Sequence, residues 1–239
     1  MRTRHLLPAL LASVLLLAGC SGSSDASGGS DGGDGKDAAA DLAARLANAK
    51  ETLDGAETIK VSLATKSLPD GITGLLSAEG SGNHSPAFEG TVTVVTGGAS
   101  LGAEVIATGG KVYAKTGFLP DFTPIDPASL KAPDPALLIS ADQGITQILV
   151  ATHGLTEDGQ TRDGNDVLTT IKGTLAGDVV QNIIPSADAA ETFAVTYRLD
   201  DDDALRDATL TGPFYPGGED VTYRVALETS DAPVTIEAP

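Results

Sequence analysis

The serine at position 100 lies in the sequence Gly-Ala-Ser-Leu-Gly, residues 98–102, which matches the G-x-S-x-G motif of serine hydrolases. In those enzymes the serine occupies a sharp turn between a strand and a helix, and a histidine further along the chain activates its hydroxyl. The one histidine downstream of it is His153. Here, however, Ser100 precedes residues 101–108, whose apolar and polar residues alternate as in a strand. The context favours a hairpin turn, and a hydrolase using Ser100 and His153 is the weaker alternative.

Other side chains that could do chemistry are scattered. His5 lies in the N-terminal apolar stretch, His84 in a polar loop, and His153 at the end of an expected helix, where a charged imidazole suits the helix dipole. Histidines this far apart do not make a metal site. The four aspartates at 200–203 lack the spacing of a calcium loop and predict a solvated turn, with adventitious calcium binding as the alternative. We therefore expect no metal and no cofactor.

Cys20 is the one cysteine of the chain, and its setting is informative. Arg2 and Arg4 precede an apolar stretch, residues 6–18, and small residues follow at 18–19. A charged segment, a short apolar segment and small residues in this order predict a secretory signal, residues 1–19. The apolar stretch is too short to cross a bilayer, which needs about 20 residues.

A signal that ends in Leu-Ala-Gly-Cys, residues 17–20, resembles the lipobox of bacterial lipoproteins. This resemblance implies that the Cys20 thiol receives a diacylglyceryl group and that cleavage makes it the new N-terminus. An ordinary secretory signal with a chance cysteine is the alternative. With Cys20 lipidated, the chain has no thiol for a disulfide or a metal site. We expect the mature chain on the extracytoplasmic side of the cell membrane, where two or three acyl chains give stable anchoring.

The charge of the chain excludes several partners. The formal net charge is −18, and removal of Arg2 and Arg4 with the signal brings it to about −20. A charge this negative repels nucleic acid and anionic lipid headgroups. We therefore expect no nucleic-acid partner, and we expect contact with the membrane through the lipid anchor instead of a basic patch.

The mature chain divides into a tether and one domain. Residues 20–37 comprise the lipidated cysteine and a Gly/Ser/Asp linker, about 16 residues of which span roughly 20–24 Å. Residues 38–239 are long enough for a single domain with a substantial core. Hydrophobic residues make up 41% of the chain but aromatic residues only 4%. The core must therefore be built mostly from aliphatic side chains.

Periodicity along the domain predicts a helix, several strands, two more helices among further strands, and a final group of three strands. The first helix carries an apolar stripe at Leu42, Leu46, Ala49 and Leu53, capped by Asp37 or Asp41. Period-two alternation follows at residues 59–64, 88–94 and 101–108, with a hairpin turn at 109–110 and a return strand at 111–115. Five prolines between residues 117 and 135 predict a loop with at most a short helix near Leu130.

The second half adds two helices and five strands. Helices are expected from about residue 137 to the glycine at 154 and over 179–184, and strands at 160–162, 167–172, 193–199, 205–211 and 221–227. We expect an α+β fold: one antiparallel sheet of about eight to ten strands, strongly curved into a half-barrel, with helices on its concave face. Such an arrangement can enclose an apolar cavity.

The chain resembles the LppX/LprAFG lipoproteins of mycobacteria and related actinobacteria, most closely the LprG branch of that family. The resemblance rests on the lipobox and on residues 59–65, 141–149, 168–177 and 196–212, which occur in family order. It implies a half-barrel that binds acylated glycolipids or triacylglycerol in an apolar cavity. It also implies carriage of these lipids toward the outer envelope, often beside a membrane efflux transporter.

Physical chemistry supports a cavity of this kind. Each methylene withdrawn from water is worth about 0.8 kcal/mol, so a sixteen-carbon chain costs roughly 12 kcal/mol to expose. Aliphatic walls suit such a chain. The candidate cavity-lining residues are Ile59, Val61, Leu63, Val92, Val94, Val105, Ile145, Ile148, Leu149, Val180, Ile183, Ile184, Val195 and Tyr197. The alternative is that they pack an ordinary filled core, in a structural or assembly lipoprotein that acts through protein contacts.

Overall fold

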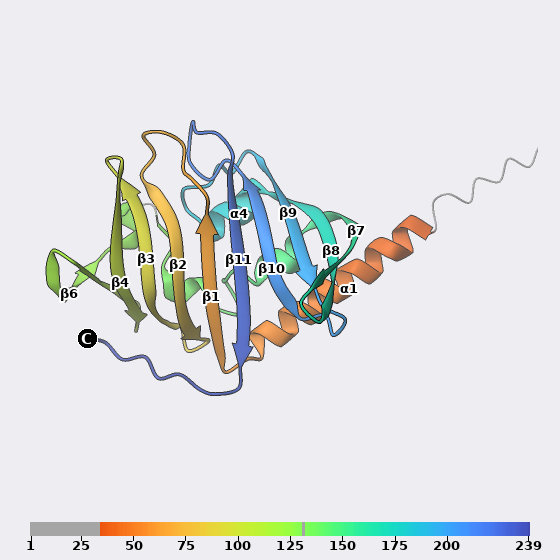
Figure 1. Cartoon of the computed structure of the whole chain (residues 1–239), viewed down its shortest axis with the longest axis horizontal. Helices are drawn as coiled ribbons and strands as arrows, with labels where there is room; N and C mark the ends of the chain where they lie inside the picture. Colours follow the sequence, from red (N-terminus) through yellow and green to blue (C-terminus); the bar gives the residue numbers. More distant parts are fainter. Residues whose placement is uncertain (1–33, 131) are drawn as a thin grey trace, which may run out of the picture.

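The structure, a computed structural model, describes residues 34–239 apart from residue 131. The predicted signal, Cys20 and most of the predicted linker lie outside these residues. Within the described part, eleven antiparallel strands form one sheet in the order β6-β5-β4-β3-β2-β1-β11-β10-β9-β8-β7 (Figure 1). The strands are β1 (Thr58–Thr65), β2 (Gly74–Asn83), β3 (Ala87–Thr96), β4 (Ala99–Thr108), β5 (Lys111–Thr116), β6 (Leu119–Ile125), β7 (His153–Asp163), β8 (Asp166–Ala176), β9 (Thr192–Leu199), β10 (Leu205–Gly212) and β11 (Val221–Ser230).

Helices cover one face of this sheet and lie behind it in Figure 1. They are α1 (Asp34–Asp54), the 3₁₀ helix η1 (Pro127–Leu130), α2 (Pro135–Leu138), α3 (Gln147–Ala151) and α4 (Gly177–Ile183). Helix α1 contacts α3 and β7, α2 contacts β3 and β4, and α4 contacts β8 and β9. The predicted α+β class with a single antiparallel sheet is therefore confirmed.

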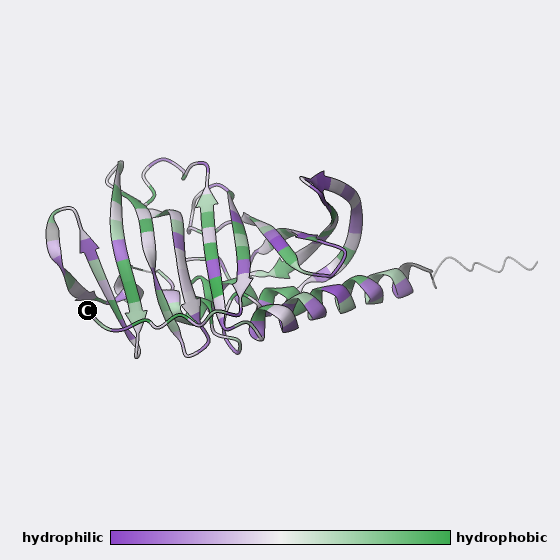
Figure 2. Cartoon of the chain, turned by 60° about the horizontal axis from the view of Figure 1, so that its bottom comes forward, coloured by the Kyte–Doolittle hydropathy of each residue, from purple (hydrophilic) through white to green (hydrophobic). Residues whose placement is uncertain are grey.

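The predicted apolar periodicities account for most of these elements. In α1 the stripe of Leu42, Leu46, Ala49 and Leu53 is buried, and Figure 2 shows hydrophobic and hydrophilic residues alternating along this helix. Every second residue is buried along β9 and along β11 as far as Leu227, as the alternation predicts. The glycines at 109–110 have φ of +60° and +70°, the left-handed conformation that a two-residue hairpin turn requires. The helix α1 begins at Asp34, earlier than either predicted cap.

Two strands were not predicted. β2 has the sequence Gly-Leu-Leu-Ser-Ala-Glu-Gly-Ser-Gly-Asn, in which glycines and small polar residues hide any period of two. β6 lies in the proline-rich stretch that predicted a loop, and it is an edge strand containing Pro120 and Pro124. Proline is tolerated there because one side of an edge strand donates no ladder hydrogen bonds. The short helix expected near Leu130 is confirmed as η1.

The single helix predicted up to the glycine at 154 is wrong. The segment forms two short helices instead, α2 and α3, separated by residues 139–146. The side chain of Asp134 caps α2 by accepting a hydrogen bond from the backbone N–H of Ala136 at 2.9 Å. His153 is the first residue of β7 and does not lie at a helix C-terminus. The apolar residues that suggested one continuous helix are thus distributed over α2, α3 and the loop between them.

The strong curvature predicted for the sheet is also wrong for this structure. The eleven strands form a broad open sheet, twisted but not rolled into a half-barrel (Figures 1 and 2). Ordinary strand twist carries the two ends of a large sheet apart without closing it. Both edges are also poor templates for further pairing, because β6 contains prolines and β7 pairs with β8 through irregular register.

Candidate functional site

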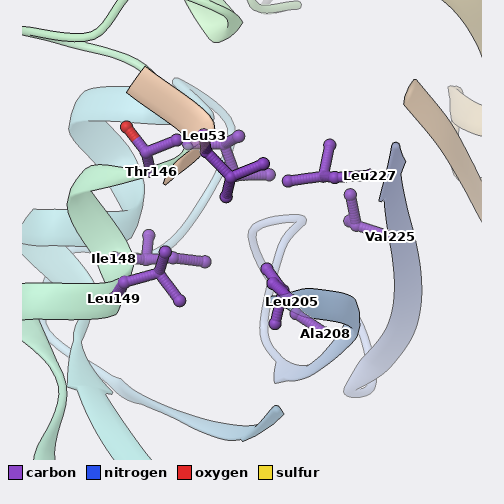
Figure 3. Close-up of a pocket in the computed structure, with 9 residues that line it drawn as sticks. Leu53, Thr146, Ile148, Leu149, Leu205, Ala208, Val225 and Leu227 are labelled. Carbon is purple, nitrogen blue, oxygen red and sulfur yellow. The ribbon is translucent and has the colours of Figure 1, made fainter. Parts of the chain in front are cut away.

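An aliphatic layer fills the space between the sheet and its helices. At its centre lies a small enclosed cavity of about 10 Å³ (Figure 3). It is lined by Leu53, Ile145, Thr146, Ile148, Leu149, Leu205, Ala208, Val225 and Leu227. A volume this small is at the lower limit for one water molecule. This cavity is therefore too small to hold an acyl chain in this conformation.

The structure brings the sequence-predicted residues together in this layer. Thirteen of the fourteen candidates belong to one apolar cluster, and Val94 is half-buried outside it. The eight that are buried are Ile59, Val105, Ile148, Leu149, Val180, Ile183, Val195 and Tyr197. The members of the cluster that are only half-buried are Val61, Leu63, Val92, Ile145 and Ile184. Three of them, Ile145, Ile148 and Leu149, line the cavity itself.

Sequence reasoning missed several residues around this cavity. Leu53 lies in the predicted stripe of α1, while Val225 and Leu227 lie in the predicted alternation of β11. The signal for these three was thus present in the periodicity. Nothing in the sequence indicated that the end of α1 and the centre of the sheet would face the same point.

The layer is covered unevenly by the helices. On β9 and β11 the inward residues are buried, with exposed fractions of at most 7%. On β1 and β3 the inward residues Val61, Leu63, Val92 and Val94 are only half-buried. Among the described helices, α2 is the one in repeated contact with β3 and β4. The part of the apolar face formed by β1 and β3 (the open apolar face: Val61, Leu63, Val92 and Val94) therefore stays accessible.

Polar groups inside the layer are already satisfied. The Tyr197 hydroxyl lies 2.7 Å from Thr152 Oγ1 and donates to the Ile148 carbonyl at 3.2 Å. Burial raises the pKa of Tyr197 well above its usual range, and the hydrogen bond with Thr152 only partly opposes this. No buried side-chain nitrogen or oxygen of the described residues lacks a hydrogen-bond partner. The buried layer thus offers apolar surface and few polar contacts to a ligand.

A pair of tyrosines closes the layer near the start of β2. The Tyr223 hydroxyl donates to the Leu75 carbonyl at 2.5 Å and lies 2.7 Å from the Tyr215 hydroxyl, which accepts from the Leu75 N–H at 3.1 Å. Burial, and then the hydrogen bond with Tyr215, raise the pKa of Tyr223 above its usual range. The two hydroxyls therefore connect β11 to β2 at one end of the open apolar face.

The acidic run at 200–203 is a turn, as predicted, and it also holds α1 in place through hydrogen bonds. Asp203 is the one described non-glycine residue with positive φ, at +61°, and its carboxylate accepts from Arg45 Nε at 2.5 Å and Asn48 Nδ2 at 3.0 Å. Burial opposes ionisation, but these hydrogen bonds outweigh it and lower the pKa of Asp203. Arg45 also donates to the Asp200 carbonyl at 2.9 Å. The run therefore connects α1 to the β9–β10 turn.

His84, in the turn between β2 and β3, joins α1 to the segment between α2 and α3. Its Nδ1 lies 2.8 Å from the Ile139 carbonyl oxygen and its Nε2 lies 3.0 Å from the Leu53 carbonyl oxygen. One imidazole thus contacts the ends of two elements that cover the layer.

Replacing His84 with alanine is expected to lower the free energy of unfolding by about 1–2 kcal/mol, because the ring no longer donates a hydrogen bond to either of two partly buried carbonyls. Urea unfolding at pH 6 measures the difference. His153→Ala, at an exposed ring, is the matched control and is expected to leave stability unchanged. Equal stability of the two variants would contradict the bridging role.

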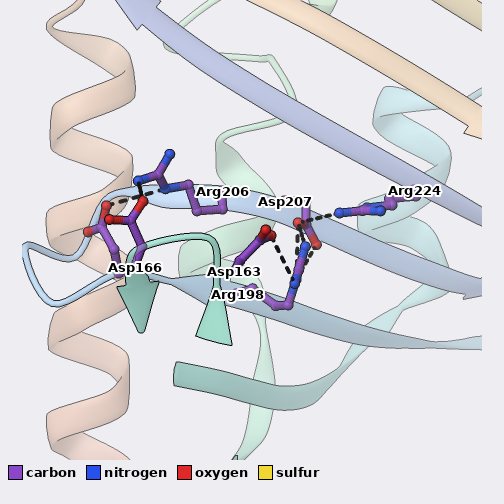
Figure 4. Close-up of polar contacts among 7 residues, drawn as sticks. Asp163, Asp166, Arg198, Arg206, Asp207 and Arg224 are labelled. Carbon is purple, nitrogen blue, oxygen red and sulfur yellow. Dashed lines mark hydrogen bonds and ion pairs between the residues drawn. The ribbon is translucent and has the colours of Figure 1, made fainter. Parts of the chain in front are cut away.

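The opposite face of the sheet carries a network of ion pairs (Figure 4). Asp207, only 5% exposed, accepts hydrogen bonds from Arg198 and, at 2.8 Å, from Arg224. Burial raises the pKa of this carboxyl, but the hydrogen bonds from both arginines outweigh burial and lower it below 3.8. Arg206 pairs with Asp166, and Arg198 also lies 3.6 Å from Asp163. The network connects β9, β10 and β11 with the β7–β8 hairpin.

Replacing Asp207 with asparagine is expected to cost about 3 kcal/mol at pH 7, because two arginines lose their shared partner. The folded pKa is depressed, so the ionised carboxylate stabilises the fold above pH 3.8, and this contribution is lost as pH falls through the folded value. The variant and the unmodified chain should thus converge in acid. Asp166→Asn, at a half-exposed pair, should cost no more than about 0.5 kcal/mol. A difference that stays constant down to the lowest pH would contradict this account.

The residues of the hydrolase alternative are far apart in the fold. Ser100 lies in β4 directly after a hairpin turn, and β4 is followed by no helix. Seven strands separate β4 from β7, where His153 lies. At about 4.8 Å per strand this is roughly 38 Å along the sheet.

Among the described residues, no three or more His, Cys, Asp or Glu side chains lie close enough together to hold a metal ion. None of the helices in residues 34–239 is long and apolar enough to cross a membrane.

Comparison with known proteins identifies the family. The family model described as LppX_LprAFG lipoprotein matches residues 38–237, which is most of the chain. The chain belongs to the LppX/LprAFG lipoprotein family. Members of this lipoprotein family bind lipids, and none is known as an enzyme. No curated protein sequence matches the chain.

Solved structures of LppX/LprAFG lipoproteins share this fold. LprF from Mycobacterium bovis is 18% identical, with a TM-score of 0.67, over 84% of this chain and 97% of that one. LppX from Mycobacterium tuberculosis is 17% identical, with a TM-score of 0.59, over 83% of this chain and 99% of that one. These comparisons confirm the predicted family but do not single out its LprG branch. Membership of a lipoprotein family implies anchoring to the membrane.

Proposed function

We propose that this LppX/LprAFG lipoprotein binds acyl chains between its sheet and its helices and carries acylated lipids across the cell envelope. The observation that carries the proposal is the open apolar face. Val61, Leu63, Val92 and Val94 continue the aliphatic surface of the core, but within the described residues no helix buries them fully. A protein folded only for stability gains by covering such a surface, because each buried methylene contributes about 0.8 kcal/mol.

Acyl chains suit this surface because they carry no hydrogen-bonding groups. The buried side-chain polar atoms of the described layer are already paired. An acyl tail that enters beside them therefore leaves no donor or acceptor without a hydrogen bond. The charged residues of β1 and β3 lie at outward positions of those strands, for example Lys60 and Glu89. A polar headgroup would thus stay at the margin while the tails lie against aliphatic side chains.

Lipid entry requires the layer to widen, because the central cavity of about 10 Å³ is far smaller than an acyl chain. The segment best suited to move is residues 139–151, which includes α3. Helix α3 has only five residues, and Ile145, which precedes it in this segment, is half-buried at the cavity wall. The open apolar face provides the entry point, and outward movement of α3 extends the site toward Leu149. The fourteen cavity-lining candidates then form the wall of the widened site.

The cargo proposed is an acylated glycolipid or a triacylglycerol, loaded and released outside the cytoplasmic membrane. Anchoring through lipidated Cys20 keeps the domain near that membrane, and the part of the predicted linker that precedes α1 at Asp34 gives it reach. A membrane efflux transporter is the proposed partner for loading. The signal at 1–19 and the domain at 38–239 complete the organisation that we propose.

A structural or assembly lipoprotein is the second candidate, because one observation favours it. The cavity at the centre of the buried half of the layer has a volume of only about 10 Å³, as expected for a filled core. In that case the chain would act through protein contacts and bind no lipid. The two candidates therefore differ in a single measurable property, the uptake of acyl chains.

Uptake is tested by transfer of a pyrene-labelled phospholipid between vesicles in the presence of the purified mature chain. The proposal predicts transfer that rises in proportion to protein concentration and saturates with labelled lipid at about one lipid per chain. The same chain loaded beforehand with triacylglycerol should transfer less of the labelled lipid. Transfer no faster than spontaneous exchange, by a chain shown to be folded, would favour the structural candidate.

A further inference from the structure

A second hollow lies on the outer face of the sheet, away from the helices and the aliphatic layer. Its volume is about 420 Å³, within the range of about 300–1,000 Å³ typical of small-molecule sites. Its floor is the backbone of Gly80 and Gly90, a cross-strand pair of β2 and β3. The side chains around it are those of Ser81, Glu89, Thr91, Glu104, Ile106 and Phe122. This face is turned toward the reader in Figure 1.

The chemistry of this hollow combines hydrogen-bonding groups with an aromatic ring. Glu89 and Thr91 are exposed on β3, and Ser81 lies on the neighbouring β2. No side-chain hydrogen bond of these three is found among residues 34–239. Phe122 of β6 supplies an apolar ring at the margin, with Lys115 Nζ 5.6 Å from its centroid. The hollow thus offers a carboxylate and two hydroxyls beside an apolar surface.

The charges around the hollow restrict the ligand. Lys115 Nζ lies 3.1 and 3.2 Å from the two carboxylate oxygens of Glu104, so this acid is compensated. Glu89 has no such partner and leaves one negative charge at the site. The whole chain is at −18, so an anionic ligand is repelled both locally and at long range. A neutral ligand rich in hydroxyl donors fits best.

We propose that this outer hollow is a binding site for a neutral sugar ring. A pyranose has adjacent hydroxyls that can donate to the Glu89 carboxylate and exchange hydrogen bonds with Ser81 and Thr91. Its C–H face can pack on Phe122, as apolar surface packs on an aromatic ring. The site is separate from the lipid site, because the side chains of Glu89 and Thr91 point away from the layer that holds Val92. The inference does not rest on the proposed lipid carriage and can fail independently of it.

The test is an NMR titration of the ¹⁵N-labelled mature chain with three neutral disaccharides, maltose, cellobiose and mannobiose. Glucuronic acid and lysine methyl ester are the anionic and cationic probes. We expect saturable shifts of the Ser81, Glu89 and Thr91 amide signals with at least one neutral disaccharide, at a Kd of about 1–10 mM. Glu89→Gln and Phe122→Ala should each weaken this binding at least fivefold. Ser62→Ala, at an exposed outward position of β1, is the matched control and should not change it.

The proposal would be overturned by no saturable shift with any neutral disaccharide or by shifts that map away from β2 and β3. It would equally be overturned if Glu89→Gln and Phe122→Ala bound the disaccharide as tightly as the unmodified chain. Binding of lysine methyl ester alone would also overturn it, because the hollow would then be a cation site. Each variant is checked for an unchanged melting temperature. All the replaced side chains lie on the surface, so the variants are expected to fold.

Discussion

Replacing Cys20 with alanine is expected to abolish anchoring of this protein to the membrane. The lipobox is the one membrane signal that we find in the sequence, and none of the helices in the described residues can span a bilayer. A thioether-linked diacylglycerol provides the chains needed for stable anchoring, and alanine accepts none. Phase partition in a cloud-point detergent, combined with the intact mass of the protein, measures the change.

The unmodified chain should enter the detergent phase with the added mass of its acyl groups, and the alanine variant should be soluble or keep its signal peptide uncleaved. Ser21→Ala, which leaves the lipobox intact, is the matched control and should partition like the unmodified chain. A processed Cys20→Ala protein that stays with the membrane would contradict the lipoprotein interpretation.

Replacing Val92 with tryptophan is expected to lower lipid binding at least tenfold with little change in stability. Val92 is a half-buried residue of the open apolar face, so an indole there can turn into the space that an acyl chain would occupy. Displacing two methylenes of bound lipid removes about 1.6 kcal/mol, which is roughly tenfold or more in affinity. The same change at Leu149, only 2% exposed, is expected to cost about 1–3 kcal/mol by overpacking.

Thr93→Trp is the matched control, because residue 93 lies on the opposite face of the same strand. Binding of pyrene-labelled fatty acid and the melting temperature are measured for each variant. Of the two variants in β3, we expect only Val92→Trp to bind weakly, and we expect both to have similar melting temperatures. Equal lipid binding by the two, or loss of binding only in step with loss of stability, would contradict an acyl-chain site on this face.

The elements with strong periodicity could be predicted from the sequence, and the others could not. The stripe at Leu42 and Leu46 repeats about once per helical turn, and the alternation around Val195 repeats at every second residue. Both patterns identify directly the side chains that are buried against the core. The glycine-rich β2 and the proline-containing β6 carry no such pattern, because their positions are decided by pairing with neighbouring strands. Sheet curvature was predicted wrongly, because strand number alone does not determine how far a sheet rolls.

The candidate site was predictable in part for the same reason. Alternation identified Val61 and Val92 as inward residues, and the structure places both on the open apolar face. It could not show that they would be half-buried while Val195 would be buried, because that difference depends on where the helices lie. Nor could it place Arg45 beside Asp203, 158 residues further along the chain. Contacts of this kind depend on the tertiary arrangement and leave no local pattern.

Lipid carriage is tested most directly by mass spectrometry of the lipids bound to the purified mature chain. The protein is isolated from its native membrane without added lipid, its Cys20-linked acyl groups are accounted for by intact mass, and non-covalently bound lipids are extracted and identified. We expect acylated glycolipid or triacylglycerol at about one molecule per chain, reduced at least tenfold in Val92→Trp and retained in Thr93→Trp. A folded chain that carries no lipid, and that takes none up from labelled vesicles, would contradict lipid carriage and favour a filled-core structural lipoprotein.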